Sequence, residues 1–341
     1  MTGNARSARV VLLSVPRIDS SPRSRRPILV AVAIGALLSA AGGITWFAIS
    51  QSASAGGDAA PAAALPDGTS MGAVELHVHE LPAVRDYYAD AVGLRVLEES
   101  EAGAVLGFDE PLIRLTVNEE GEDGSTLAEP GLYHSAILYP DRQALAAAIL
   151  NLANTAPHTF QGSADHAVSE AFYFLDPEGN GLELYADRPA SEWVWERGEV
   201  QLGSAELDPN AFIAEHLGDG AAADGATVGH VHLKVGDLEQ AEEFYAGALG
   251  FAVTARADGA LFYAADGYHH HVATNTWQSE GAESRTNATG LAGFTVAVPG
   301  AGAIDDIETR LADGGYTSER SESGITAWDP WGNAVRLVVP G

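Results

Sequence analysis

The side chains that could carry chemistry in this sequence are histidines and carboxylates. Eleven His and 47 Asp and Glu are present in 341 residues, whereas Cys is absent. Disulfides, thiolate metal sites and Cys nucleophiles are therefore excluded, and any metal ion must be bound by His, Asp or Glu. The densest group is the run His269-His270-His271. On a strand, His269 and His271 would share one face and His270 would point to the other.

Internal repeats determine the expected architecture. Residues 71–96 resemble residues 228–253, and the stretches that begin at Gly131 and Gly290 form a second similar pair. Each copy reads as an alternating strand, a helix and three shorter strands separated by Gly or Asp-Gly turns. We therefore expect an α+β chain of four βαβββ modules, in which module 1 resembles module 3 and module 2 resembles module 4.

Module 3 shows this order most clearly. Its helix is expected to begin after Asp237, to bury a stripe formed by Leu238, Ala241 and Tyr245, and to end at Gly250. The tight turns that precede the last strands of modules 2 and 4 begin at Asp176 and Asp329, and their Asn and Gly residues serve the turn rather than chemistry.

The N-terminus reads as a targeting segment. Residues 28–50 carry no charge, and as a helix they would extend about 35 Å, enough to span a bilayer. Arg25 and Arg26 precede this run in a pattern similar to a twin-arginine export signal. Small residues up to Ala55 fit a signal-peptidase site. Cleavage after Ala55 and retention as a membrane anchor both stay open; in either case we expect the catalytic part outside the cytoplasmic membrane.

These features divide the chain into successive parts. They are a signal or membrane-anchor segment (1–55), a flexible tether (56–70), a first domain with modules 1 and 2 (71–187), a linker (188–227) and a second domain with modules 3 and 4 (228–340). The linker contains Trp193, Trp195 and a short helical pattern that begins at Asp208, so it is more than a loose tether. The formal charge of −29 would repel polyanions, so no nucleic acid is expected as a partner.

Two kinds of motif carry a resemblance to a known family. The signature GHVHLKVGDLEQAEEFYAGALGF and the ending DPEGNGLELYADRP resemble vicinal-oxygen-chelate proteins, the superfamily of glyoxalases, bleomycin-resistance proteins and extradiol dioxygenases. DHAVSEAFYFLDPEGNGLELYADRP and GYHHHVATNTW are similar to a branch of catechol 2,3-dioxygenases. The resemblance covers about residues 70–340. It implies two tandem vicinal-oxygen-chelate domains behind the N-terminal hydrophobic helix.

The same resemblance implies a function. The implied activity is that of a metal-dependent extradiol dioxygenase, which cleaves the ring of a catechol-like aromatic diol with O2. The metal would be Fe(II), with Mn(II) as the alternative, and no organic cofactor is implied. The expected partners are thus a small aromatic substrate and O2, together with the membrane through residues 28–50 unless that segment is cleaved.

In this superfamily the metal ligands lie on the first and last strands of the modules. At these places modules 1 and 4 have Ala73 and Gly293 on their first strands and no acid on their last strands. Module 2 offers His134 and Glu183, and module 3 offers His230. Each residue alone also fits a structural role. Pairing module 2 with module 3 would assemble two imidazoles and a carboxylate, the ligand set of non-haem Fe(II) oxygenases.

Extradiol cleavage also needs a base for a substrate hydroxyl and a hydrogen-bond donor near the reacting oxygen. The resemblance implies a His and a Tyr upstream of the glutamate ligand. We assign His166 as the acid/base and Tyr173 as the donor, although Tyr173 also fits a packing role. His271 and His269 are candidates for a fourth ligand or for the pocket wall. The remaining histidines are expected to be structural or exposed: His77, His79, His158, His216 and His232.

Two other functions remain open at this point. A glyoxalase-type isomerase or lyase would use the same metal cup with four protein ligands, and would be favoured if His271 binds the metal. A bleomycin-resistance-type protein would bind a small molecule without catalysis, and modules 1 and 4 are candidates for such a second, metal-free cup. Fold alone does not decide between these functions.

Overall fold

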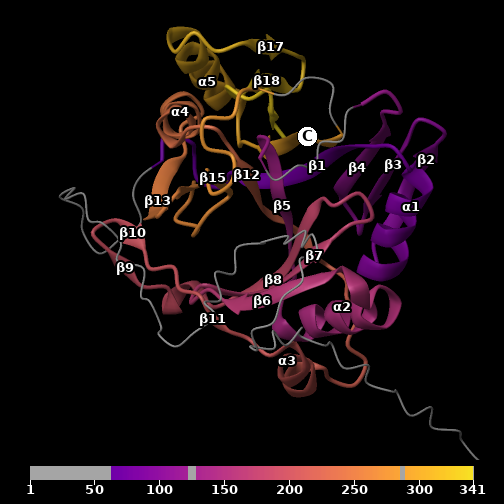
Figure 1. Cartoon of the computed structure of the whole chain (residues 1–341). Coiled ribbons are helices and arrows are strands. Elements are labelled where there is room, and N and C mark those ends of the chain that lie inside the picture. Colours follow the sequence, from indigo (N-terminus) through magenta and orange to yellow (C-terminus); the bar gives the residue numbers. More distant parts are fainter. Residues whose placement is uncertain (1–62, 122–127, 285–288, 341) are drawn as a thin grey trace, which may run out of the picture.

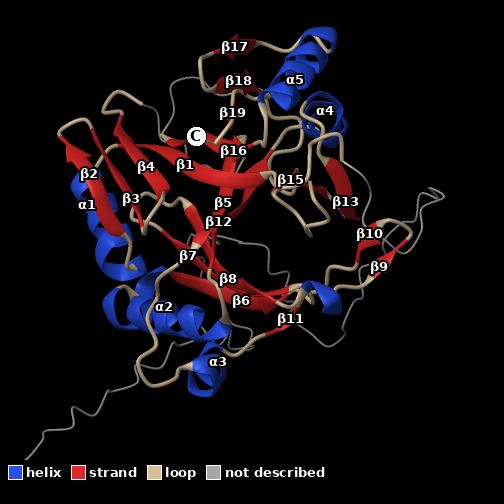
Figure 2. Ribbon diagram, turned by 180° about the vertical axis from the view of Figure 1, so that it is seen from behind, coloured by secondary structure: helices blue, strands red, loops and turns tan. Residues whose placement is uncertain are grey.

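The computed structural model describes residues 63–121, 128–284 and 289–340. Two mixed β-sheets form the framework, and helices flank them (Figures 1 and 2). The expected α+β architecture of βαβββ modules is confirmed. The proposed targeting segment (1–55) lies outside the described residues. Within the described residues, no helix combines the length and apolarity that crossing a bilayer requires.

The elements follow the four modules in order. Module 1 contains β1 (Ser70–Val78), α1 (Leu81–Asp86), η1 (Tyr87–Val92), β2 (Arg95–Ser100), β3 (Gly103–Gly107) and β4 (Pro111–Val117). Module 2 contains β5 (Gly131–Leu138), α2 (Arg142–Thr155), η2 (Pro157–Thr159), β6 (Phe160–Asp165), β7 (Ser169–Leu175) and β8 (Gly181–Asp187). The connection to the second half contains η3 (Ala190–Glu192), β9 (Trp195–Glu196), β10 (Glu199–Val200), β11 (Ala205–Glu206) and α3 (Pro209–His216).

The second half repeats the pattern. Module 3 contains β12 (Thr227–Lys234), α4 (Leu238–Glu242), η4 (Glu243–Ala248), β13 (Ala252–Ala257), β14 (Ala260–Ala264) and β15 (Val272–Asn275). Module 4 contains β16 (Gly290–Ala297), α5 (Ala301–Asp313), β17 (Ser318–Arg320), β18 (Gly324–Trp328) and β19 (Ala334–Val338).

Each sheet joins one module from either half of the chain. The nine-stranded sheet has the order β11-β6-β7-β8-β5-β12-β15-β14-β13, and the eight-stranded sheet has the order β17-β18-β19-β16-β1-β4-β3-β2. The antiparallel pairs β5–β12 and β1–β16 make the two joints. The expected pairing of module 2 with module 3 is therefore confirmed. Each sheet thus contains strands from both halves of the chain. The division into consecutive domains at 71–187 and 228–340 stays a prediction.

Helix contacts, by contrast, stay within each half. Helix α2 packs against η1, and α5 packs against η4. Both η1 and η4 are π-helical, and this wider winding frees carbonyl groups at the helix end. Asn151 of α2 donates to the carbonyls of Asp90 and Ala91 at 2.8 and 2.9 Å. Arg310 of α5 likewise donates to the carbonyls of Ala248 and Leu249 at the end of η4. Each half is thus held by side-chain caps between helices.

The predicted turn and cap residues act as expected. Asp237 accepts a hydrogen bond from the Gln240 amide and begins α4, and Gly250 ends the helical segment with φ +95°. The Asp176 carboxylate accepts from the amides of Glu178 and Asn180 in the turn before β8. Because this turn sets where β8 begins, it also sets the place of the glutamate that β8 carries.

The described parts of the segments outside the modules pack on the fold. The amides of Ala64 and Leu65, in the last part of the expected tether, donate to the Gly250 carbonyl, and Leu65 is buried. The helical pattern predicted in the linker is confirmed as α3, where Asp208 accepts from the first free amides. One continuous apolar core extends through both sheets and their helices.

Candidate metal centre

The proposed metal ligands come together at the joint between modules 2 and 3. His134 lies on β5 and His230 on the neighbouring strand β12, while Glu183 lies on β8 at the other side of β5. Ala136 of β5 is the register partner of both His230 and Glu183. Its methyl group is small enough for the imidazole and the carboxylate to meet above it. The register thus explains why three residues far apart in sequence converge.

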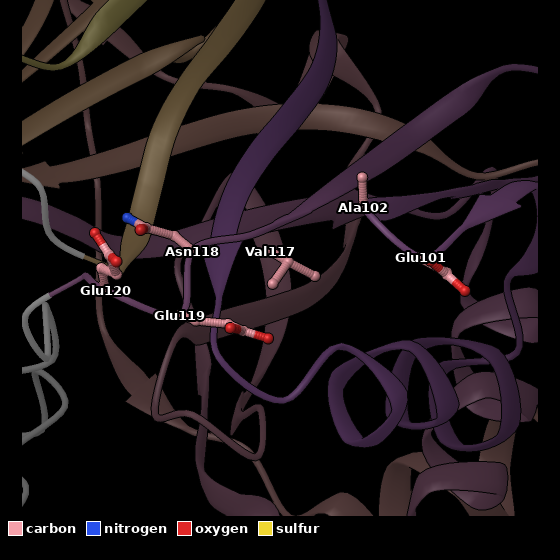
Figure 3. A pocket seen from close by; sticks show the side chains of 6 residues that line it. All are labelled: Glu101, Ala102, Val117, Asn118, Glu119 and Glu120. Atoms are coloured by element: carbon pink, nitrogen blue, oxygen red, sulfur yellow. The ribbon is translucent and has the colours of Figure 1, made fainter.

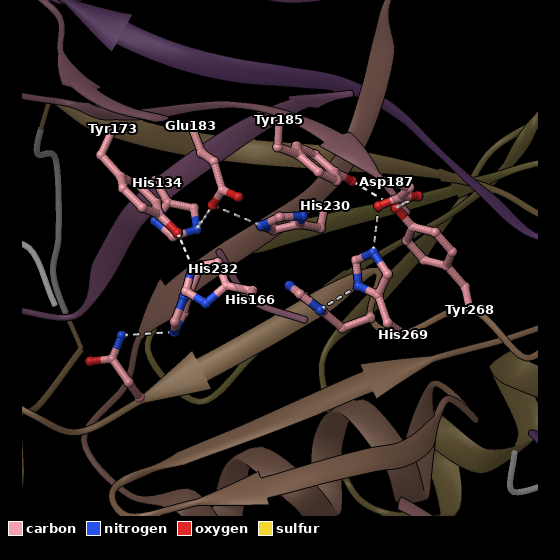
Figure 4. A network of polar contacts seen from close by, with 12 residues as sticks. His134, His166, Tyr173, Glu183, Tyr185, Asp187, His230, His232, Tyr268 and His269 are labelled. Atoms are coloured by element: carbon pink, nitrogen blue, oxygen red, sulfur yellow. Dashed lines mark hydrogen bonds and ion pairs between the residues drawn. The ribbon is translucent and has the colours of Figure 1, made fainter. Parts of the chain in front are cut away.

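The distances are those of a compact site (Figure 4). Glu183 Oε2 lies 2.9 Å from His134 Nε2 and 3.3 Å from His230 Nε2. One ligand atom from each residue lies within 4.8 Å of the others, and all three residues are buried. Among the residues that the structure describes, this is the group of His and carboxylate side chains placed to hold a metal ion.

The electrostatics of the three residues fit a cation. Burial opposes ionisation of Glu183, but His230 and His134 hold the pKa of its carboxyl well below the ordinary range. Burial lowers the pKa of His230, which favours the neutral imidazole that a metal needs. Both nitrogens of the buried His134 ring lack a hydrogen-bond partner despite the short approach to Glu183. A buried carboxylate faced by unpartnered imidazole nitrogens fits a divalent ion.

The two predicted catalytic residues lie beside this group. Tyr173 of β7 is opposite Glu183 in the sheet register, and its ring centre lies 5.6 Å from that of His134. His166 Nε2 lies 2.7 Å from the Tyr173 hydroxyl, and its Nδ1 lies 2.9 Å from the Gly203 carbonyl. A carbonyl only accepts, so in the neutral ring Nδ1 carries the proton and Nε2 accepts from Tyr173. Burial, followed by the charge of Glu183, raises the pKa of Tyr173 well above its usual value.

The run of three histidines differs from expectation. It lies in the connection between β14 and β15, because β15 begins only at Val272. The ring of His270 lies 4.2 Å from that of His230, whereas the ring of His269 lies 6.5 Å away. The alternating-strand interpretation, in which His270 points away from the site, is therefore wrong. An irregular connection does not impose the two-residue alternation of a strand.

A buried chain of hydrogen bonds leads from His270 away from the metal group. His269 Nε2 lies 2.9 Å from Asp187 Oδ1, and its Nδ1 lies 2.8 Å from His270 Nδ1. The carboxylate can only accept, so Nε2 of neutral His269 carries the proton and its Nδ1 accepts from His270. Burial lowers the pKa of His270 well below its ordinary value. In the resulting neutral ring, Nε2 of His270 is a free proton acceptor.

His271 is engaged elsewhere. Its Nδ1 accepts a hydrogen bond from the Ala265 amide at 3.2 Å, and burial lowers its pKa to about 3. His271 is not part of the convergent ligand group, and a role as fourth ligand or pocket residue stays a prediction. His269 is hydrogen-bonded to His270, the nearer neighbour of His230.

Several residues that lie near the site were not assigned to it from the sequence. His270, Asp187 and the Tyr185–Tyr268 pair belong to the hydrogen-bonded chain beside His230. On the other side, the His232 ring lies 4.9 Å from that of His134, and its Nε2 accepts from the Asn275 amide. The sequence signal that could have found them is the motif GYHHHVATNTW itself, which contains Tyr268, His270 and Asn275.

In the part of the chain that the structure describes, the eight-stranded sheet has no equivalent group of ligands. Arg336 occupies the place on β19 that Glu183 has on β8, and it forms an ion pair with Glu75 at 2.9 Å. A Cβ on Gly293 would lie 2.5 Å from an Arg336 nitrogen, so the guanidinium fills the space that corresponds to His134. A surface cavity of about 520 Å³ near β4 is lined by Glu101, Glu119 and Glu120 and by none of the metal group (Figure 3).

Comparison with known proteins identifies the family. A model of the Glyoxalase/Bleomycin resistance protein/Dioxygenase superfamily matches residues 227–337. A catechol-2,3-dioxygenase of Bacillus subtilis (strain 168) is 36% identical over 282 residues, which are 80% of this chain and 97% of that protein. A biphenyl-2,3-diol 1,2-dioxygenase 3 of Rhodococcus globerulus is 30% identical over 119 residues, 34% of this chain and 62% of that protein.

A solved structure agrees in fold. The putative dioxygenase from Bacillus subtilis subsp. subtilis str. 168 matches with a TM-score of 0.57 at 12% identity, over 81% of this chain and 87% of that chain. The chain belongs to the glyoxalase/bleomycin resistance protein/dioxygenase superfamily. It is a homologue of a catechol-2,3-dioxygenase, and it carries a buried His-Glu-His group suited to a metal ion.

Proposed function

We propose that this protein is a metal-dependent extradiol dioxygenase that cleaves the ring of a catechol with O2. The observation that carries the proposal is the convergence of His134, Glu183 and His230 within 4.8 Å of one another. Two imidazoles and one carboxylate leave further positions on a metal ion free for a substrate. The similarity to a catechol-2,3-dioxygenase supports the same reaction.

Fe(II) is the metal that we assign to the site, with Mn(II) as its alternative. His134 and His230 would bind it through Nε2 and Glu183 through its carboxylate, because these atoms face one another. The bound metal would supply the positions at which the catechol oxygens and O2 meet. The role of the chain is to hold those ligands in a buried place from which bulk water is excluded.

The neighbouring side chains supply proton acceptors and donors. Tyr173 presents its hydroxyl beside His134, and His166 behind it accepts that proton at Nε2. His270 lies on the other side, next to His230, with Nε2 as a second acceptor. A catechol hydroxyl that enters between them could lose its proton to His270 directly, or to His166 by way of the Tyr173 hydroxyl. When His166 does not hold the Tyr173 proton, that hydroxyl could donate a hydrogen bond to the reacting oxygen. His166 and His270 would thus share the acid/base role that was expected of His166 alone.

The ligand number favours this reaction over a glyoxalase-type one. A glyoxalase-type site uses four protein ligands, whereas the convergent group among the described residues has three. The candidate for the fourth, His271, has its Nδ1 occupied by the Ala265 amide. A metal-free binding protein would have no use for a buried carboxylate between two imidazoles, which is costly to bury unpaired.

Oxygen uptake tests the proposal directly. Anaerobically purified protein should contain one iron or manganese ion per chain, measured by elemental analysis. With a panel of catechols, the metal-loaded protein should consume O2 and form a yellow ring-cleaved product. Metal-loaded protein that consumes no O2 with any catechol would contradict the dioxygenase function. Conversion of a thiol hemiacetal by the same sample would instead support the glyoxalase alternative.

We also assign a location from the sequence. The uncharged run at residues 28–50 behind Arg25 and Arg26 supports membrane attachment or export, with the catalytic part outside the cytoplasmic membrane. Export of the folded, metal-loaded protein is what a twin-arginine signal would allow. Cleavage after Ala55 would release the enzyme, and retention would anchor it.

A further inference from the structure

The connection between the two halves contacts both edges of the nine-stranded sheet. At one end, β11 pairs with the edge strand β6. At the other end, β10 lies against β13, the opposite edge strand, and Glu199 faces Arg256 at 3.8 Å. We call residues 193–206 the strap (Figure 1, where β9 and β10 lie beside β13 and β11 lies beside β6). This linker therefore connects the two edges of one sheet.

The strap contacts residues on both sides of the metal group. The Gly203 carbonyl accepts from His166 Nδ1, and the Gly203 amide donates back to the His166 carbonyl at 3.1 Å. The ring of Trp193 lies 5.1 Å from that of His269. His166 reaches the site through Tyr173, and His269 reaches it through His270. The strap therefore contacts residues that flank the metal group on both sides rather than a remote surface.

The face that the strap turns towards the sheet is apolar. Val200 of the strap, Val168 of the β6–β7 turn and Ala255 of β13 form one buried cluster. Leu202 and Phe262 pack against it and remain partly exposed. The ring of Phe262 also lies 5.2 Å from that of His270. This apolar cluster thus extends from the strap to Phe262, which lies beside His270, the neighbour of His230.

We propose that the strap is the specificity element of the site: it selects catechols whose ring carries an apolar substituent and disfavours those that carry a charge. This inference rests on the proposed function, because it takes a catechol as the ligand. The two hydroxyls are held at the polar end by the metal group. The far edge of the ring then meets Leu202 and Phe262, where an alkyl group is buried favourably and a carboxylate loses its hydration.

Anaerobic calorimetry tests this without turnover. Full-length, Fe(II)-loaded protein is titrated with 4-ethylcatechol and with 3,4-dihydroxybenzoate, and the ratio of the two dissociation constants is compared between variants. The wild type should bind the ethyl compound at least about tenfold more tightly. Leu202→Arg should abolish or reverse that preference. Val194→Arg adds the same charge to the same segment, but Val194 is 54% exposed, so its ratio should stay at the wild-type value.

A second variant distinguishes a change in ligand preference from misfolding caused by the introduced charge. Leu202→Ala removes apolar contact without adding charge and should lower the preference for the ethyl compound several-fold while metal content is unchanged. A ratio that is equal in wild type, Leu202→Ala and Leu202→Arg overturns the inference, as does a wild type that binds neither compound. Oxygen uptake is measured on the same samples. A shifted binding ratio without oxygen uptake would contradict the proposed reaction but uphold the strap as specificity element.

Discussion

His134 and His230 belong to different halves of the chain, yet their rings lie 5.5 Å apart on neighbouring antiparallel strands. Their proximity depends on the pairing of β5 with β12, which no local sequence feature imposes. Glu183 completes the group from the parallel neighbour β8. The metal centre is therefore a property of the joint between modules, and changes at that joint should affect metal binding first.

Removing any one ligand should release the metal. His134→Ala, His230→Ala and Glu183→Gln should each weaken metal binding by more than about 100-fold, because even residues that merely orient a ligand are worth 10–100-fold. Elemental analysis after anaerobic loading and desalting measures the loss. The matched control is Arg336→Gln, which changes the corresponding place in the other sheet and should leave metal content intact. Full metal retention in all three ligand variants would contradict the site.

Enlarging Ala136 should damage the centre without removing a ligand. Its fully buried methyl group lies in register with both Glu183 and His230, so Ala136→Leu would push the two ligands apart. We expect reduced metal content and a loss of about 1–3 kcal/mol in the free energy of unfolding. Thr295 is the register partner of Arg336 in the other sheet. Thr295→Leu should keep its metal, and equal metal content in both variants would show that Ala136 is not a spacer.

The His166–Tyr173 pair should affect turnover but not metal binding. His166→Ala and Tyr173→Phe should lower kcat by roughly 10²–10⁴, the usual contribution of positioned proton transfer. Metal content should match that of the wild type, because neither side chain is in the ligand group. Steady-state oxygen uptake measures the effect. The exposed His158 provides the control as His158→Ala. Wild-type kcat in both test variants would remove the pair from the mechanism.

The stability of the metal-free protein should fall in acid partly because of His271. Its pKa is about 3 in the folded chain and about 6.5 in the unfolded chain. Between these values only the unfolded state binds the extra proton. The contribution of neutral His271 to the free energy of unfolding is therefore fully present above pH 6.5 and decreases as the pH falls. The expected slope is about 1.4 kcal/mol per pH unit. Urea unfolding at pH 4.5 and 6 should therefore show a smaller pH dependence for His271→Gln than for the wild type. Parallel pH profiles would argue against a neutral, buried His271.

The N-terminal segment should control location and nothing else. Deletion of residues 1–55 should give a soluble protein with unchanged metal content and oxygen uptake, because the metal group and the strands that carry it come from later parts of the chain. Replacing Arg25 and Arg26 by Lys should block export if the twin-arginine route is used. Fractionation of cells expressing each variant provides the measurement. Export of the Lys variant at the wild-type level would exclude that route, and a full-length chain recovered without membrane association or export would contradict the assignment of residues 28–50.

Much of the architecture follows from local sequence. The repeated alternation of apolar residues, the acidic helix starts such as Asp237 and the Asp176 turn depend on neighbours a few residues away, so the modules could be predicted one by one. The family resemblance implied the strand positions of the ligands, and the vacancies at Ala73 and Gly293 then pointed to His134, Glu183 and His230 as the ligand set. What the sequence could not show is the π-helical winding of η1 and η4, or the hydrogen bonds by which Asn151 and Arg310 of another module cap their ends.

The surroundings of the metal group were decided by tertiary structure. His270 faces His230 because the three histidines lie in an irregular connection, where strand alternation does not apply. The strap reaches residues on both sides of the metal group because its ends contact opposite edges of a sheet formed from two halves of the chain. Residue types and spacing thus determine which side chains are available for chemistry. Only long-range strand pairing determines which of them meet, because that pairing depends on burial summed over whole modules rather than on any local motif.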